Sequence, residues 1–201
     1  MKNKLKKILP SVEKPTRYIG TEFNSVHKDL NGINIRFAFC FPDVYEVGMS
    51  HLGMKILYHL LNSVDDIYCE RVFAPWVDME EKMRENNIPL FSLETMSPVS
   101  DFDFIGFTLQ YEMSYSNIVN MLKLANVAPK SCDRKEGDPF VCFGGPCAYS
   151  SEAIADFADF YMLGEGEEVM IEVMDAYREW KKRGGTRFEF LKEISQIGGI
   201  Y

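Results

Sequence analysis

The chain has 201 residues, of which 46% are hydrophobic and 26% charged, the proportions of an ordinary soluble globular protein. No apolar run approaches the ~20 residues that a membrane helix needs, and the basic start has no apolar stretch long enough for a secretory signal. We therefore expect a cytoplasmic protein without a membrane segment. The formal net charge of −8 repels phosphate backbones and disfavours nucleic acid as a partner of this domain alone.

The first 32 residues show no sustained periodicity, and we predict that residues 1–30 form an extension lying across the surface. Its lysine cluster at residues 2–7 is predicted to be a solvated tail. From residue 33 the pattern becomes an alternation of strands and helices. The strands are predicted at residues 33–41, 67–73, 104–109, 139–142 and 157–162, with a possible short edge strand at 90–93.

The first predicted helix, at residues 51–62, follows a loop at 43–49 and has Ser50 as its N-cap. Further helices are predicted at residues 76–86, 114–126, 167–182 and 187–195. Such alternation predicts an α/β fold, a doubly wound, mostly parallel sheet of about five strands of the flavodoxin-like kind. We place the α/β domain at residues 31–183 and the start of a linker at 184–201.

The candidate site lies where strands end, because open α/β sheets bind ligands in the crevice outside the carboxyl ends of their strands. Two glycine motifs fall at such ends, Gly-Gly-Pro at 144–146 and Gly-Glu-Gly-Glu at 164–167, and glycine lets the backbone approach a ligand closely. Together, four strand ends supply the candidate binding residues Tyr45, Ser50, Thr108, Gln110, Gly144, Gly145, Gly164, Glu165, Gly166 and Glu167.

The glutamates of the second motif constrain the ligand. A helix N-terminus usually attracts phosphate, but Glu165, Glu167 and Glu168 would repel a pyrophosphate there. A ligand rich in amide or hydroxyl donors fits this turn better. The alternative is that the glutamates only complement the helix dipole and that the glycine pair is only a tight turn.

No catalytic or metal residue is predicted. His27, His51 and His59 have no acidic partner at the spacing of a catalytic triad, although His51 lies at the mouth of the crevice. The five cysteines have no zinc spacing and no C-x-x-C pair. Cys40 and Cys142 lie in apolar runs typical of packing, whereas the role of Cys147 stays open.

The two glycine motifs and the strand end at 106–109 resemble the cobalamin-binding-like N-terminal domain of radical SAM enzymes. The segments 14–20, 41–50, 70–76 and 106–112 also look like a bacterial subfamily of radical SAM proteins, so the resemblance covers nearly the whole chain. It implies that the glycine turns lie against a corrin and that cobalamin is a possible cofactor of this domain. The histidine motif D-x-H-x-x-G is absent, so cobalamin would have no protein histidine from that motif.

The resemblance also implies a C-terminal radical SAM domain with a [4Fe–4S] cluster and S-adenosylmethionine, which together modify an unknown substrate. These 201 residues contain no C-x-x-x-C-x-x-C motif, and we expect them to be a piece of a longer chain. The domain would position cobalamin or a substrate beside the cluster. The alternative is a ligand-free docking domain for the catalytic barrel or for a macromolecule such as tRNA or a ribosomal component.

One feature of the crevice separates these two functions. Tyr111, Tyr149 and Met49 filling the groove would favour docking, whereas an open groove over Gly144 and Gly145 would favour a corrin. A flavin carrier is disfavoured, because the first loop lacks a phosphate cradle rich in serine and threonine.

Overall fold

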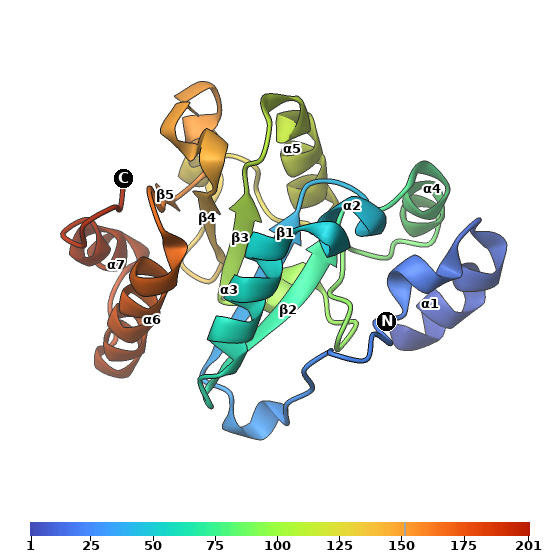
Figure 1. Ribbon diagram of the computed structural model, residues 1–201, viewed down its shortest axis with the longest axis horizontal. Coiled ribbons are helices and arrows are strands. Elements are labelled where there is room, and N and C mark those ends of the chain that lie inside the picture. The colour runs from blue at the N-terminus through green and yellow to red at the C-terminus, as the bar shows by residue number, and fades with distance from the viewer. Residues whose placement is uncertain (151) are drawn as a thin grey trace.

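The protein, described here by a computed structural model of residues 1–150 and 152–201, is built around one parallel sheet (Figure 1). Its strand order is β2-β1-β3-β4-β5, and every neighbouring pair is parallel. The strands are β1 (Ile35–Phe41), β2 (Ile67–Phe73), β3 (Phe104–Thr108), β4 (Phe140–Gly144) and β5 (Phe160–Tyr161). The predicted doubly wound α/β fold of five strands is confirmed.

Helices cover both faces of this sheet. They are α1 (Lys2–Ile8), α2 (Tyr45–Ser50), α3 (Leu52–Asn62), α4 (Val77–Glu85), α5 (Tyr115–Leu124), α6 (Gly166–Arg183) and α7 (Arg187–Ile194). Buried residues of α3, α6 and α7 share one core cluster, whereas those of α1, α4 and α5 share the other. The two clusters are separated by the sheet, so the strands are covered on both sides, as their largely apolar sequences require.

Aromatic rings hold the central strands together on the α6 face. Phe37 of β1 stacks on Phe104 of β3 at 6.0 Å between ring centroids, and Phe104 stacks on Phe140 of β4 at 5.7 Å. Tyr177 of α6 meets the ring of Phe104 edge-on at 4.7 Å, and Phe190 of α7 contacts Phe140. Packed aromatic pairs each contribute ~1 kcal/mol beyond the area they bury, so this row fixes α6 and α7 on the sheet.

The connection after β1 differs from its prediction. Residues 45–50 form the short helix α2 rather than a loop, and the N-cap of α3 is His51, not Ser50. The Oγ of Ser50 donates to the carbonyl oxygen of Val47 inside α2, while Nδ1 of His51 accepts from the N–H of Met54. The N-cap lies one residue later than predicted because the Ser50 hydroxyl is already hydrogen-bonded within α2.

The N-terminal lysines are not a tail. They belong to α1, where Leu5 and Ile8 are buried and the lysines lie on the exposed side. Val12 and Tyr18 are buried further along the extension. The first part of the extension therefore packs into the core cluster of α4 and α5, and Figure 1 shows α1 beside α4.

The last residues cover the free edge of β5. The N–H of Tyr161 donates to the carbonyl oxygen of Tyr201 at 2.7 Å, and that of Leu163 donates to Gly199 at 2.7 Å. At the other edge, the predicted strand at 90–93 is reduced to a single bridge between Phe91 and Pro98. The domain limits at residues 30 and 183 stay a prediction. Within the described residues, no helix is both long and apolar enough to cross a membrane.

Candidate functional site

A cavity of about 360 Å³ opens at the carboxyl ends of β1, β3 and β4, between the first turns of α3 and α6. This volume is in the range of ~300–1,000 Å³ that is usual for small-molecule sites. The cavity lies beside the point where the strand order reverses, between β1 and β3, which is where doubly wound sheets bind ligands. The fold itself therefore accounts for its position.

The floor and walls of the cavity are apolar. Phe39 and Cys142 come from the strands, Leu57 from α3 and Met170 from α6. The walls meet where α3 approaches α6: a Cβ placed on Gly166 would lie 3.5 Å from the side chain of Leu57. A planar apolar group of a ligand would be desolvated here at little cost.

The two glycine motifs form the rim. Gly145 has φ of +97°, and a Cβ there would lie 2.9 Å from Thr108 Oγ1 and 3.0 Å from the backbone of Leu109. Only glycine fits this left-handed, crowded position. Gly144 is different, because a Cβ there would meet the carbonyl oxygen of Met162 at an ordinary 3.5 Å. Its missing side chain leaves space in the cavity rather than relieving strain.

The polar groups of the rim are mainly hydrogen-bond acceptors. Thr108 Oγ1 accepts from Gln110 Nε2 at 2.6 Å, an arrangement that leaves the Oε1 oxygen of Gln110 as an acceptor. Glu165 and Glu167 are exposed at the start of α6, where Glu165 makes no side-chain cap. The site can thus accept hydrogen bonds from a ligand that carries several N–H or O–H groups.

His51 supplies a donor on the opposite side of the rim. Its Nδ1 accepts the Met54 N–H at 3.1 Å, so a neutral ring carries its proton on Nε2. The ring also contacts Phe41 at 5.4 Å between centroids. The polar rim therefore combines one imidazole N–H with acceptors from Gln110, Glu165 and Glu167.

Eight of the ten predicted binding residues line this cavity: Thr108, Gln110, Gly144, Gly145, Gly164, Glu165, Gly166 and Glu167. The structure places Tyr45 and Ser50 outside it. The hydroxyl of Tyr45 donates to Glu22 at 2.7 Å, and burial together with that carboxylate raises the pKa of Tyr45 to about 12. Sequence reasoning did not include the apolar lining, such as Leu57 and Met170, because core and cavity-lining residues have the same helical spacing.

None of the three bulky residues that could fill the groove lines the cavity. The hydroxyl of Tyr111 donates to Asp43, which together with burial raises the pKa of Tyr111 to about 12. Tyr149 is 70% exposed, and the sulfur of Met49 contacts Arg71. The groove over Gly144 and Gly145 is open.

Comparison with known proteins shows the radical SAM part of the resemblance. A family model described as "Radical SAM proteins, N-terminal" matches residues 53–201, which include α3 from its second residue and all strands but β1. The chain belongs to this family. The cavity described above is thus the candidate site of a radical SAM N-terminal domain.

An uncharacterised protein of Methanocaldococcus jannaschii is similar to this radical SAM N-terminal domain, with 28% identity over 152 residues. The alignment covers 73% of this chain and 28% of the relative, so the chain spans less than a third of the relative's length. No solved structure matches the chain.

The described side chains of this domain offer no ligand set for the metal cluster that radical SAM chemistry implies. In the part of the chain that the structure describes, no three His, Cys, Asp or Glu side chains are grouped to hold a metal ion. Cys40, Cys69 and Cys142 are buried, and burial raises the pKa of each thiol. These thiols do not fit the ligand set of a [4Fe–4S] cluster.

Proposed function

We propose that this domain binds cobalamin, or an equivalent ligand, in the carboxyl-end cavity and presents it to the catalytic part of a radical SAM enzyme. The single observation that carries the proposal is the open cavity bordered by both glycine motifs. A ligand-free docking domain would need no such space. The family assignment supports the link to radical SAM chemistry.

The chemistry of the rim favours a corrinoid over a nucleotide. Corrin side chains carry amide N–H groups, for which Gln110, Glu165 and Glu167 are acceptors. The same carboxylates would repel a pyrophosphate. A corrinoid is much larger than 360 Å³, so one arm of the ligand would enter the apolar cavity while the ring would lie over the glycine rim. Bound cobalamin would supply the cobalt-centred chemistry of radical methylation or rearrangement.

The residues of this chain would bind and orient the ligand rather than react. Gly144 and Gly145 would let the ring lie close to the backbone, and His51 would donate from Nε2. The [4Fe–4S] cluster and S-adenosylmethionine would belong to a C-terminal radical SAM domain of the same protein. That domain would cover the mouth and exclude water from the reacting groups.

A second function is favoured by exposed apolar side chains near the mouth. Leu52 is 69% exposed, Met113 87% and Tyr149 70%. Leu52 lies between the lining residues His51 and Gly53, and Met113 follows the lining residue Gln110 by three positions. The hydroxyl of Tyr149 lies 3.6 Å from the position that a Cβ would take on Gly164. This rim would suit docking of the catalytic domain, and it is compatible with a ligand held between the two domains. A net charge of −8 argues against RNA as the docked partner.

The test is a titration of the protein with hydroxocobalamin, followed by difference absorbance and equilibrium dialysis. The proposal predicts saturable binding of one equivalent. Absence of binding at millimolar hydroxocobalamin, both for this chain and for the longer protein with its catalytic domain, would contradict it and favour docking alone.

A further inference from the structure

A second cavity, of about 650 Å³, lies on the other side of α3 from the first. It is enclosed by α2, α3 and the segment of the extension at residues 22–26. Its apolar wall is supplied by Val26, Met54 and Tyr58. Phe23, Lys55 and His59 are exposed at its rim. The side chain of Arg71 on β2 also lines this cavity.

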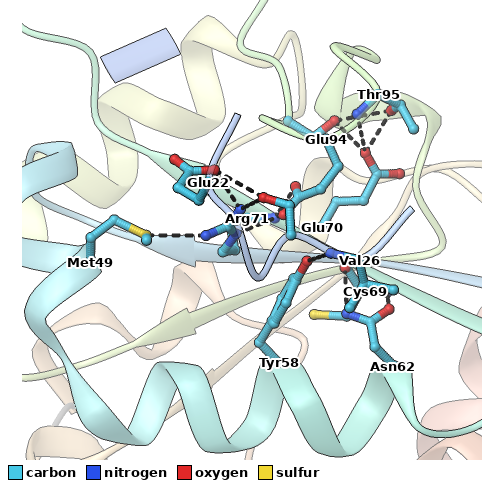
Figure 2. A network of polar contacts seen from close by, with 12 residues as sticks. Glu22, Val26, Met49, Tyr58, Asn62, Cys69, Glu70, Arg71, Glu94 and Thr95 are labelled. Atoms are coloured by element: carbon cyan, nitrogen blue, oxygen red, sulfur yellow. Dashed lines mark hydrogen bonds and ion pairs between the residues drawn. The ribbon is translucent and has the colours of Figure 1, made fainter. Parts of the chain in front are cut away.

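Arg71 is nearly buried, with 6% of its surface exposed, and two edges of its guanidinium group are well paired. Its Nε donates to Glu94 at 2.6 Å. Its Nη2 donates to Glu22 at 2.9 Å and to the hydroxyl of Ser25 at 2.8 Å. Figure 2 shows these contacts converging on Arg71 from separate segments of the chain.

The third edge is not well paired. Across residues 1–150 and 152–201, the partner of Nη1 is the sulfur of Met49 at 3.2 Å, on the opposite side of Arg71 from Glu94 in Figure 2. A thioether is a weak acceptor, and Nη1 carries two N–H groups of a cation. Leaving such donors without an oxygen acceptor costs free energy, more so for a charged group. Met49 also lines the cavity, so Nη1 lies at its wall.

The charges around Arg71 define what would bind there. The guanidinium of Arg71 already faces two carboxylates, Glu94 and Glu22. The cation Lys55 is exposed at the rim of the same cavity. At Nη1, an anion would lie close to the two carboxylates, and a cation would lie against the guanidinium itself. A neutral carbonyl oxygen accepts from Nη1 without either penalty, and the apolar walls suit the rest of the molecule.

We propose that the cavity between α2, α3 and the N-terminal extension is a second binding site, for a small neutral carbonyl compound with an apolar body. The carbonyl oxygen accepts from Arg71 Nη1 in place of the Met49 sulfur. The body of the ligand packs against Met54 and Tyr58. This site is separate from the carboxyl-end cavity, because α3 stands between the two.

Methionine methyl groups report on both cavities in one experiment. Met49 and Met54 line the second cavity, whereas Met162 and Met170 line the first. The full 201-residue chain is labelled with ¹³C-methyl methionine, and its signals are assigned by single Met→Leu substitutions. Benzamide is the probe, with benzoate and benzylammonium as ligands of matching shape and opposite charge.

The proposal predicts that benzamide shifts the Met49 and Met54 signals saturably and leaves those of Met162 and Met170 in place. Benzoate and benzylammonium should bind at least about tenfold more weakly, since a like-charge contact costs more than the ~1.4 kcal/mol that corresponds to tenfold. Benzamide should bind the Met49→Leu protein more tightly, because the competing sulfur is gone.

Several results would overturn the proposal. They are no saturable shift of Met49 or Met54 at millimolar benzamide, shifts confined to Met162 and Met170, and benzoate binding as tightly as benzamide. A Gly144→Val variant, altered only in the first cavity, should bind benzamide unchanged. Loss of binding in that variant would mean that the probe occupies the first cavity and would also contradict the proposal.

Discussion

The Nδ1 atom of His51 accepts a hydrogen bond from the backbone N–H of Met54 at 3.1 Å, which caps α3 at the mouth of the carboxyl-end cavity. While it caps the helix, the neutral ring has its proton on Nε2 and no lone pair there for a metal. His51 is therefore placed to donate a hydrogen bond at the mouth of the cavity rather than to ligate a metal. The same side chain serves the fold and the site.

His51→Ala should destabilise the protein by about 1 kcal/mol, the usual cost of losing a helix cap. His51→Asn should keep the cap, since asparagine is a good N-cap residue, and lose only the Nε2 donor. Urea denaturation measures the first effect and ligand titration the second. Equal stability of the Ala and Asn variants would show that the cap contributes nothing.

Gly144→Val should remove ligand binding without unfolding the protein. A Cβ at Gly144 meets its nearest neighbour at 3.5 Å, so the new side chain fills cavity space rather than clashing with the backbone. We expect at least about a tenfold loss of affinity, or ~1.4 kcal/mol. The matched control is Gly137→Val, where a Cβ has nothing within 4 Å. If both variants bound hydroxocobalamin as the wild type does, the ligand would lie elsewhere.

Gly145→Val should lower stability more than Gly144→Val does, although the two glycines are adjacent in the same motif. A valine at φ of +97° would be strained and would press on Thr108 and Leu109. We expect Gly145→Val to unfold at lower urea concentration than Gly144→Val. The reverse order would contradict the different roles assigned to the two glycines.

Asp159 should be essential for stability. Its carboxylate is 2% exposed and accepts from the N–H of Val141, pairs with Arg187 and lies 2.8 Å from Arg134 Nη1. Asp159→Asn would leave two buried guanidinium groups without their counter-charge, at a cost of roughly 3–5 kcal/mol. Asp156→Asn is the control, since Asp156 is 78% exposed, and it should change stability by less than about 0.5 kcal/mol. Similar unfolding midpoints for the two variants would contradict this account.

The ion pair between Asp66 and Arg178 should make stability depend on pH in the acid range. Hydrogen bonds from Arg178 and Asn34 lower the pKa of Asp66 to about 2. A lowered carboxyl pKa stabilises the folded state above the unfolded value of ~3.9, and this contribution is lost as the pH falls from about 4 to 2. The wild type should thus exceed Asp66→Asn in stability at pH 7 and lose that advantage by pH 2. A difference that stayed constant from pH 7 to pH 2 would contradict the coupling.

The sheet could be predicted from the sequence because its strands are largely apolar runs between turn residues. β2 was located to the residue, although Glu70 and Arg71 are buried in it. Their partners could not be predicted, because Thr95 and Glu94 come from a segment with no regular pattern. Long-range pairing of charges leaves no periodic signal.

The glycine motifs of the site could be predicted from the sequence, whereas the lining residues placed by tertiary packing could not. The rim motifs follow from strand ends and turn chemistry. The prediction that Tyr45 lies in the site was wrong, because a residue that follows β1 can face either the cavity or the ion pairs of Arg71. The sequence does not distinguish these directions, since the short helix α2 that turns Tyr45 toward Glu22 has no clear sequence signal.

A corrinoid site in the carboxyl-end cavity is tested most directly by the methionine methyl spectrum of the protein titrated with hydroxocobalamin. The signals of Met162 and Met170 should shift with saturation at one equivalent, while those of Met49 and Met54 stay in place. Binding that left Met162 and Met170 unmoved, or no binding to this chain and to the longer protein, would contradict a corrinoid site in the carboxyl-end cavity.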